Sequence, residues 1–421
     1  MSNPKYSQLA NTLIGSEIVK LGGIIKERIR QGHHIYNYTI GDFDAGQFPI
    51  PAALKDGIID AYEKGYTTYP IADGELDLRQ AISDFLQTKE GLKYSPDEIL
   101  VSNGGRPLIY AIFRSIVDKG DKVIYPLPSW NNNHYTHFTE GVHVQIPASR
   151  ENNFMPTAEQ IAPHLKGATL LALCSPLNPT GTTFSKEELE SICDLVLAEN
   201  ESRAPEEKKL YVMYDQIYWT LTFGSTQHHN PVSLRPAMKE YTVFVDGISK
   251  AFAATGVRVG WSMGPVSLLA KMKAINSHVG SWAPLAEQKA TAAFLRQHDL
   301  VDVYLQHIKS EISYRLTHLY NGFKQMHEEG FMVDAIAPQA AIYLTVQINL
   351  KGKKTPEGKV LETQEEVTSY ILDEARLAIV PFGFFGADKE SSWYRISVGC
   401  SKKEEIPDVL QHLRNALIKL T

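Results

Sequence analysis

The chain contains 421 residues, more than a single hydrophobic core usually organises, so we expect a large domain and a smaller one. Charged residues make up 21% of the chain and the formal net charge is −6, which disfavours binding to nucleic acid or other polyanions. No run of 18 or more apolar residues occurs, and the first twenty residues lack the apolar stretch of a signal peptide. We therefore expect an unprocessed protein that binds no membrane.

The sequence has three cysteines, an odd number that does not suit a disulfide framework. Cys174, Cys193 and Cys400 form neither a CxxC pair nor the Cys/His spacing of a zinc site. The sequence therefore predicts no metal site, and it favours a reducing compartment, the cytoplasm.

Short apolar runs alternate with amphipathic stretches between about residues 107 and 380, a pattern typical of parallel βαβ units. In chain order we expect a helix at 108–116 and strands at 122–125, 169–174, 210–214 and 242–245. We also expect the charged segment 199–209 to be a solvated surface loop. Functional residues should follow the strands, because ligands bind at the carboxyl ends of parallel strands.

In the C-terminal part we expect a helix at about 301–329, strands at 341–347 and 394–398, and a closing helix from about residue 403. This order suits a separate α+β domain. We therefore predict that residues 1–55 join the small domain, that 56–300 form the large domain, and that 301–421 form the small domain. A dinucleotide-binding Rossmann protein is disfavoured, since no G-x-G-x-x-G follows an early strand.

The most informative stretch is residues 243–261, VFVDGISKAFAATGVRVGW, in which an apolar strand leads to a Ser-Lys pair and then to an arginine. A lysine amine becomes a nucleophile where its surroundings lower its pKa, and a guanidinium presents a planar fork to phosphate. The stretch resembles the Ser-x-x-Lys region of the class I and II aminotransferases, aspartate-aminotransferase-like enzymes that use pyridoxal phosphate (PLP). The resemblance implies that Lys250 forms a Schiff base with PLP and that Arg258 binds its phosphate.

Two motifs upstream match the same family in order. The run 211–218, YVMYDQIY, resembles its D-x-x-Y, which implies that Asp215 pairs with the pyridine nitrogen and Tyr218 with the ring's phenolic oxygen. The run 174–181, CSPLNPTG, matches N-P-T-G, which implies that Asn178 hydrogen-bonds the cofactor oxygen. Taken alone, Asp215 would be interpreted as a strand-end acid that caps a turn.

A glycine-rich segment, SNGGRPL at 102–108, precedes the expected helix, so its backbone N–H groups can hold a phosphate at a helix N-terminus. Gly104, Gly105 and Arg106 match the family's phosphate loop. Farther along, YPLPSWNNNHY places Trp130 at the family's aromatic position, stacked on the pyridine ring. A packing tryptophan is the alternative interpretation.

Two further matches concern the substrate and a second subunit. The segment YRIS at 394–397 resembles the one whose arginine grips the substrate α-carboxylate as a bidentate pair, which implies that role for Arg395. In YTTYPIADGELDLRQAI, Tyr69 matches the family's tyrosine that reaches the phosphate of the neighbouring subunit, with Tyr66 as the alternative. The resemblance therefore implies a homodimer with shared active sites.

Three positions depart from the family pattern. Gly247 stands where many relatives have Ser or Thr, so we expect one phosphate hydrogen bond to be lost or supplied by water. The usual G-E/x-P-D is here GDFDAGQFP, which aligns Gly41 with the glycine that lines the substrate site. The usual G-A-F-Y-L is here AAIYLT, so the pocket wall is less predictable there.

Taken together, the matches run from about residue 41 to residue 399. They imply an α/β protein of PLP-dependent transferase fold type I, with a mainly parallel central sheet flanked by helices and a smaller α+β domain. The catalytic residues would be Lys250, Asp215 and Tyr218. The substrate contacts would be Arg395, Asn178, Gly41 and Trp130.

The implied reaction moves an amino group from an L-amino acid, of aspartate/glutamate type or aromatic, to a 2-oxo acid such as 2-oxoglutarate. A PLP-dependent C–S β-lyase of the same fold and a non-catalytic PLP-binding sensor are the alternatives. The cation for an acidic side chain stays open among Arg106, Arg114 and Lys273. Trp282 either shapes the side-chain site or packs elsewhere.

Overall fold

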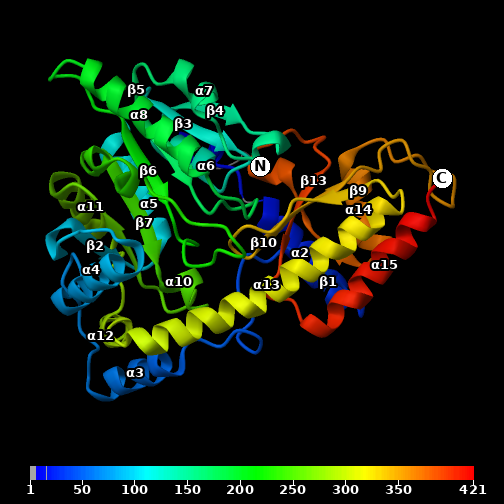
Figure 1. The fold of residues 1–421 in the computed structure, drawn as a ribbon, viewed down its shortest axis with the longest axis horizontal. Helices are drawn as coiled ribbons and strands as arrows, with labels where there is room; N and C mark the ends of the chain where they lie inside the picture. The colour runs from blue at the N-terminus through cyan, green and yellow to red at the C-terminus, as the bar shows by residue number, and fades with distance from the viewer. Residues whose placement is uncertain (1–5, 16) are drawn as a thin grey trace.

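A seven-stranded sheet forms the larger part of the protein, whose computed structural model describes residues 6–15 and 17–421 (Figure 1). Its strands are β2 (Ile99–Ser102), β3 (Lys122–Leu127), β4 (Val142–Pro147), β5 (Ala168–Cys174), β6 (Tyr211–Asp215), β7 (Thr242–Gly247) and β8 (Gly260–Met263). The order is β2-β8-β7-β6-β5-β3-β4, and all neighbours are parallel except β8, which is antiparallel to β2 and β7. The four strands expected from the sequence are confirmed.

Apolar residues on both faces of this sheet explain why helices cover it on two sides. Leu170 and Ala172 face one buried cluster with α5 (Gly105–Ile116) and α11 (Val266–Val279). Leu171 and Leu173 alternate with them and face the opposite cluster, because successive side chains of a strand point to opposite faces. That cluster includes α3 (Ala52–Glu63), α4 (Leu76–Glu90), α7 (Ala158–Ile161), α8 (Lys186–Ser202), α10 (Ile248–Ala251) and α12 (Leu285–Leu295). Two short helices, α6 (Asn132–Phe138) and α9 (Pro231–Leu234), lie in the connections.

The prediction of a solvated loop over 199–209 is wrong for its first part. Helix α8 continues to Ser202, and the side chain of Arg203 is only 6% exposed. Its guanidinium donates to the carbonyls of Leu165 and Ala168, which ties the helix end to the start of β5. The side chain of Asn200 bonds both the N–H and the carbonyl of Leu210, so the charged stretch is anchored where the chain returns to the sheet.

A second, antiparallel sheet has the order β12-β13-β10-β9, formed by Val380–Pro381, Trp393–Ser397, Tyr343–Ile348 and Val333–Ala335. Helices α13 (His298–Glu328), α14 (Gln364–Glu374) and α15 (Ile406–Ile418) belong to this part of the chain. The helix and strands expected there are confirmed within a few residues. Strand β1 (Tyr36–Asn37) pairs with β11 (Leu377–Ala378), so the N-terminal segment joins this part. The domain boundaries themselves stay a prediction.

The long helix α13 connects the two parts. Near its start Val301 packs in the core of the large sheet, whereas Ile308 and Ile312 pack in the core of the small sheet. Figure 1 shows this helix in yellow, running obliquely from the side of the large sheet to the side of the small sheet. Helix α13 thus packs against both sheets and links them.

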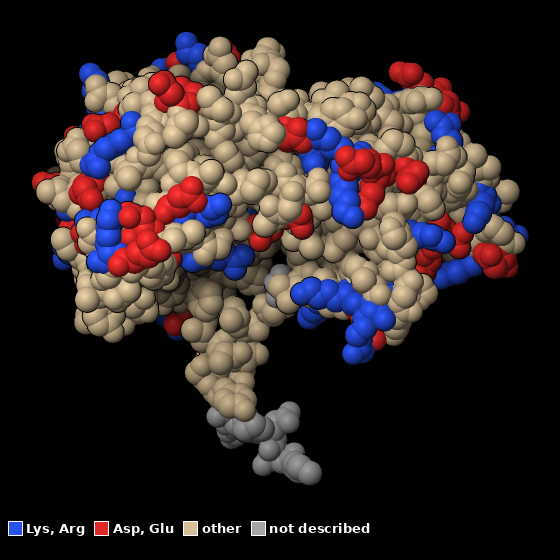
Figure 2. Space-filling model, turned by 90° about the horizontal axis from the view of Figure 1, so that it is seen from below, with Lys and Arg blue, Asp and Glu red and all other residues tan. Residues whose placement is uncertain are grey.

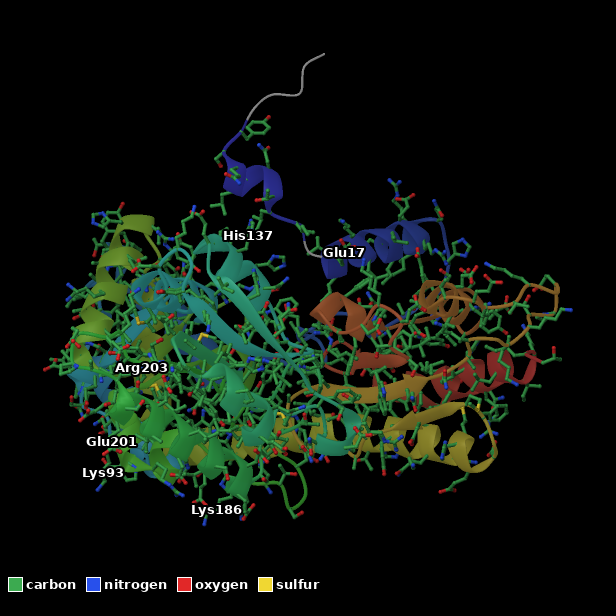
Figure 3. All side chains as sticks on the ribbon, turned by 90° about the horizontal axis from the view of Figure 1, so that it is seen from above. Glu17, Lys93, His137, Lys186, Glu201 and Arg203 are labelled. Carbon is green, nitrogen blue, oxygen red and sulfur yellow. The ribbon has the colours of Figure 1, made fainter. Side chains whose placement is uncertain are left out.

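The N-terminal helices lie at the outside of the molecule. Helix α1 (Gln8–Thr12) stands off from the body in Figure 3, and Thr12 Oγ1 lies 3.0 Å from Nε2 of His137. Helix α2 (Glu17–Arg30) follows it. Figure 2 shows Lys and Arg groups interspersed with Asp and Glu groups over the face seen from below.

Membrane and metal features were also expected to be missing. Within residues 6–15 and 17–421, no helix is both long and apolar enough to cross a membrane. In the same part of the chain, no three His, Cys, Asp or Glu side chains are grouped as metal ligands. All three cysteines are free thiols.

Candidate active site

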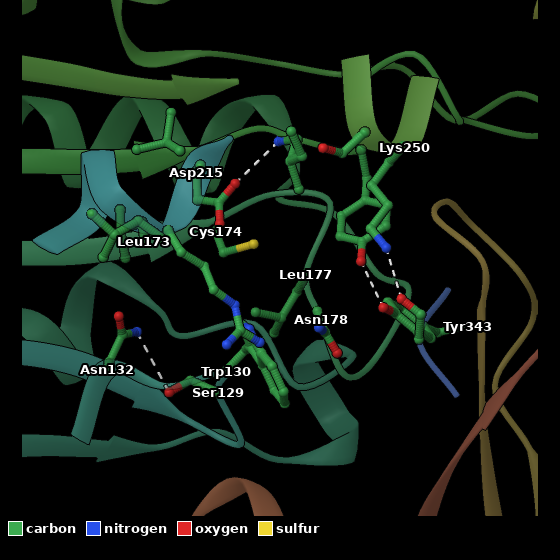
Figure 4. Close-up of a pocket in the computed structure, with 18 of the residues that line it drawn as sticks. Ser129, Trp130, Asn132, Leu173, Cys174, Leu177, Asn178, Asp215, Lys250 and Tyr343 are labelled. Atoms are coloured by element: carbon green, nitrogen blue, oxygen red, sulfur yellow. Dashed lines mark hydrogen bonds between the residues drawn. The ribbon is translucent and has the colours of Figure 1, made fainter. Parts of the chain in front are cut away.

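A pocket of about 350 Å³ opens at the carboxyl ends of β3, β5, β6 and β7, and it also receives side chains from the small sheet (Figure 4). Most residues predicted from the sequence line it: Gly41, Gly105, Arg106, Trp130, Asn178, Asp215, Tyr218, Lys250, Arg258 and Arg395. Gly104 adjoins this group through Arg258. Tyr69 lies outside the pocket and is 85% exposed. The structure thus brings together residues from 41 to 395 in one cavity.

Lys250 lies on α10, the single helical turn that directly follows β7. Its Nζ donates a hydrogen bond of 2.7 Å to the carbonyl oxygen of Gly41. Burial lowers the pKa of Lys250 to about 8, although the nearby Asp42 carboxylate acts in the opposite direction. A larger share of the amine is therefore neutral near pH 7 than for an exposed lysine, as a nucleophile or base requires.

Asp215 ends β6 and lies across the pocket from Lys250 in Figure 4. Burial raises the pKa of this carboxyl to about 6, and its Oδ1 accepts a hydrogen bond of 3.1 Å from the N–H of Ile217. Cys174 stands beside it because the two residues are in register on β5 and β6, and burial raises the pKa of the thiol. On this wall of the pocket, the Asp215 carboxyl thus accepts few hydrogen bonds from the described residues.

Two arginines meet at the start of α5. Arg258 donates to the carbonyls of Thr255 and Asn103 at 2.6 and 2.7 Å, and Arg106 lies over the Trp130 ring with its Cζ 5.3 Å from the centroid. Within the described residues, neither arginine forms an ion pair with a carboxylate. Burial and the neighbouring Arg106 lower the pKa of Arg258. Two cations at a helix N-terminus, with no carboxylate within ion-pair distance among the described residues, could hold an anion.

The backbone conformation and close packing at residue 104, just before α5, require a glycine. Its φ of 98° lies in the left-handed region, and a Cβ there would come 2.1 Å from Nη2 of Arg258. A side chain at this position would displace the guanidinium. The close approach to Arg258 therefore requires a glycine here, and the role of this segment in phosphate binding stays a prediction.

Arg395 of β13 is only 2% exposed and has no carboxylate partner in the described part of the chain. Its Nη1 donates to Oδ1 of Asn178 at 3.0 Å, and its Nη2 donates to the carbonyl of Thr39 at 2.7 Å. Nε has no hydrogen-bond partner, and burial lowers the pKa of the guanidinium. A buried guanidinium held on two neutral oxygens remains available for a carboxylate ligand.

Sequence reasoning left several pocket residues without a role, namely Ile18, Asp42, Ser129, Asn132, Ser249, Thr255 and Tyr343. Thr255 Oγ1 donates to Oδ1 of Asp42 at 2.6 Å, and the OH of Tyr343 lies 2.6 Å from that of Tyr218. Asp42 and Tyr343 fall in GDFDAGQFP and AAIYLT, the two segments that depart from the family pattern. Within AAIYLT, however, Tyr343 stands at the tyrosine of G-A-F-Y-L, so the match at this position was the signal for Tyr343.

The residues considered as contacts for the substrate side chain lie in different parts of the structure. Of the three cations, only Arg106 lines the pocket. Arg114 donates to the carbonyl of Phe138, and Lys273 pairs with Asp73. Trp282 is not in the pocket of this chain, and its ring packs edge-on against Tyr69 with centroids 5.3 Å apart.

Close backbone packing accounts for Gly247. A Cβ at this residue would lie 2.8 Å from both the carbonyl oxygen of Val259 and the Cα of Gly260 on the neighbouring strand. Real side chains do not tolerate such a contact unless the backbone moves. The Ser or Thr of many relatives therefore does not fit this backbone.

Known proteins resemble this chain over most of its length. The family model described as aminotransferase class I and II matches residues 34–413. The chain belongs to this family. The aspartate aminotransferase of Rhizobium meliloti (strain 1021) is 29% identical over 409 residues, covering 96% of this chain and 94% of the relative. The aspartate aminotransferase of Bacillus sp. (strain YM-2) is 30% identical over 393 residues, covering 93% of each.

A solved aspartate aminotransferase structure agrees with this assignment. The crystal structure of the aspartate aminotransferase from Rhizobium meliloti has a TM-score of 0.89 and 27% identity, and the match covers 100% of both chains. The predicted fold type and the predicted aminotransferase activity are confirmed. The lyase and sensor alternatives are not favoured.

Proposed function

We propose that this aminotransferase holds PLP in the pocket and moves an amino group from an L-amino acid, of aspartate/glutamate type or aromatic, to a 2-oxo acid such as 2-oxoglutarate. The single observation that supports it most is that the Lys250 amine, whose pKa is lowered by burial, shares one cavity with the Asp215 carboxyl and with the Arg258 guanidinium, which forms no ion pair among the described residues. These three groups match the aldehyde, ring nitrogen and phosphate of PLP in chemistry.

The donor set fits the cofactor group by group. Arg258, with the backbone of Gly104 and Gly105, would hold the phosphate at the start of α5. Asp215 would pair with the ring nitrogen, Tyr218 and Asn178 with the phenolic oxygen, and Trp130 would stack on the ring. When bound, PLP supplies a carbonyl carbon for the amino group and a ring that accepts electron density from the substrate Cα.

Side chains of the protein bind the substrate and move its proton. Arg395, oriented by Asn178 and by the Thr39 carbonyl, binds the substrate α-carboxylate as a bidentate pair. This contact fixes the substrate Cα, so that its hydrogen lies within reach of the Lys250 amine. Lys250 Nζ then takes that proton, a role to which its pKa of about 8 is suited near neutral pH.

An acidic donor is the substrate class that the site supports best. Arg106 is the only one of the three candidate cations in the pocket, and it is free of any ion pair among the described residues. Relatives bearing the name aspartate aminotransferase support the same choice. Trp130, which packs under Arg106, gives the pocket an aromatic surface that suits an aromatic donor as well.

We also propose a homodimer with shared active sites, working in the cytoplasm. Tyr69 is 85% exposed and outside its own pocket, and apolar side chains that are half exposed surround it in sequence: Ile59, Tyr62, Ile71 and Leu76. Such a surface suits burial against a second copy. Three free thiols suit a reducing compartment.

The test is an absorbance spectrum of the purified protein, followed by addition of single amino acids without an acceptor. Loss of the visible cofactor band with stoichiometric release of one oxo acid identifies the donor and supports the proposal. Catalytic accumulation of pyruvate and ammonia would instead indicate a lyase. Absence of any cofactor band after incubation with PLP would refute the cofactor assignment.

A further inference from the structure

Tyr343 connects three parts of the pocket although the sequence motifs assign it no role. It comes from β10 of the small sheet and is 1% exposed. Its hydroxyl lies 2.6 Å from the hydroxyl of Tyr218, and the guanidinium of Arg395 lies 4.8 Å from its ring centroid. A Cβ at Gly41 would meet the same hydroxyl at 2.9 Å. In Figure 4 a dashed line that ends at the Tyr343 hydroxyl, close to Lys250, marks this hydrogen bond.

The backbone of Tyr343 is fixed by the turn that carries Asn178. Gly181 of that turn has a φ of 70°, and a Cβ there would come 2.3 Å from the carbonyl oxygen of Tyr343. Thr345 Oγ1 donates to the carbonyl of Thr180 at 2.8 Å, two residues along the same strand. The ring of Tyr343 therefore has a defined place relative to the cofactor side of the pocket.

Either hydroxyl can donate in the Tyr218–Tyr343 hydrogen bond, but only one direction is compatible with the proposed contact between Tyr218 and the cofactor. Each hydroxyl has one proton to donate and two lone pairs to accept with. If Tyr218 donated to Tyr343, its proton would be used and the cofactor oxygen would lose that donor. If Tyr343 donates to Tyr218, the proton of Tyr218 is free for the cofactor oxygen, and the first bond strengthens the second by polarising it.

We propose that Tyr343 is a positioning residue for Tyr218: its hydroxyl donates to the Tyr218 oxygen and directs the Tyr218 proton toward the phenolic oxygen of the cofactor. This inference rests on the proposed function, in which Tyr218 binds that oxygen. The charged and titratable groups that act on Tyr343 are Arg395, Tyr218, Cys174 and Asp42. Of these, only Tyr218 is hydrogen-bonded to it.

The test is the pH midpoint of the visible absorbance band of the bound cofactor, measured in Tyr343→Phe, Tyr218→Phe and the double variant. A donor on the phenolic oxygen stabilises its deprotonated form, so removing the donor raises the midpoint. Tyr218→Phe should raise it most. Tyr343→Phe should raise it by roughly half a pH unit, because it weakens the donor without removing it. The double variant should match Tyr218→Phe, since Tyr343 acts through Tyr218.

Tyr394→Phe is the matched control. Tyr394 is also fully buried in the small sheet, and its hydroxyl bonds the side chains of Gln364 and Thr368 outside the pocket. Its loss should leave the midpoint at the wild-type value. The inference is overturned if Tyr343→Phe also leaves the midpoint unchanged while Tyr218→Phe moves it, or if the two shifts add. If Tyr218→Phe itself has no effect, the proposed assignment of Tyr218 fails, and the inference with it.

Discussion

The amine of Lys250 is hydrogen-bonded to the carbonyl of Gly41, 209 residues away in the chain, at 2.7 Å. A carbonyl is a neutral acceptor, so it orients the amine without stabilising the ammonium form as strongly as a carboxylate would. Burial therefore dominates and brings the pKa to about 8. Because Gly41 also borders Tyr343 and Arg395, the position of the amine depends on both sheets.

Lys250→Ala should abolish turnover and the visible absorbance band of the bound cofactor. The loss of a positioned proton-transfer group alone lowers rates by about 10²–10⁴-fold, and the covalent attachment is lost with it. The measurements are steady-state transamination and the absorbance spectrum. Lys309→Ala is the control, because burial also lowers the pKa of Lys309 but the residue lies outside this pocket. Normal transamination by Lys250→Ala would refute the assignment.

Arg258→Ala should chiefly weaken PLP binding. Hydrogen bonds to charged groups contribute about 1.5–3 kcal/mol, so we expect the dissociation constant of PLP to rise by roughly 10- to 150-fold. Titration of the cofactor-free protein with PLP measures it. Saturating PLP should restore most of the activity, since Arg258 anchors the cofactor phosphate and takes no part in making or breaking bonds. Arg114→Ala, at the other end of α5, should bind PLP normally.

Local motifs explain how much of the site could be predicted. Asp215 ends a buried apolar strand, and Lys250 and Asn178 follow such strands within a few residues, so a pattern along the chain identifies both the strand and the residue. Parallel strands then place their carboxyl ends on one edge, which brings these side chains into one pocket. The strands were predictable for the same reason, whereas the fold type followed from the resemblance of these motifs to the family.

Contacts between the two sheets could not be predicted. Asn178 and Arg395 are 217 residues apart, and Tyr218 and Tyr343 are 125 residues apart. No periodicity encodes such pairs, because they depend on how the small sheet is placed against the large one. The first part of segment 199–209 was predicted wrongly for a related reason. Its charge suggested exposure, but the Arg203 guanidinium donates to carbonyls just before and at the start of β5.

Asp215→Asn should remove a pH-dependent part of the stability of the cofactor-free protein. The folded-state pKa of about 6 is above the ordinary 3.8, so the folded protein binds more protons than the unfolded chain between these values. The stabilisation is fully present below pH 3.8 and is lost as the pH rises through 6. Relative to Asp215→Asn, the wild type should thus lose at most roughly 3 kcal/mol across this window.

Urea unfolding of both cofactor-free proteins at several pH values measures this difference. A difference in unfolding free energy that stays constant across the window would contradict the prediction. Asp56→Asn serves as the control, because the Asp56 side chain is 69% exposed on α3.

Gly247→Ser should destabilise the protein instead of improving its hold on phosphate. The substitution restores the hydroxyl of many relatives, but its Cβ would lie 2.8 Å from the Val259 oxygen and the Gly260 Cα. Overpacking of this kind costs about 1–3 kcal/mol because backbone atoms must move. We expect a lower melting temperature and unchanged or weaker PLP binding. Gly256→Ser, whose Cβ would meet nothing within 4 Å, should keep the wild-type melting temperature. Tighter PLP binding by Gly247→Ser at an unchanged melting temperature would show that strand β7 can shift to accommodate the side chain.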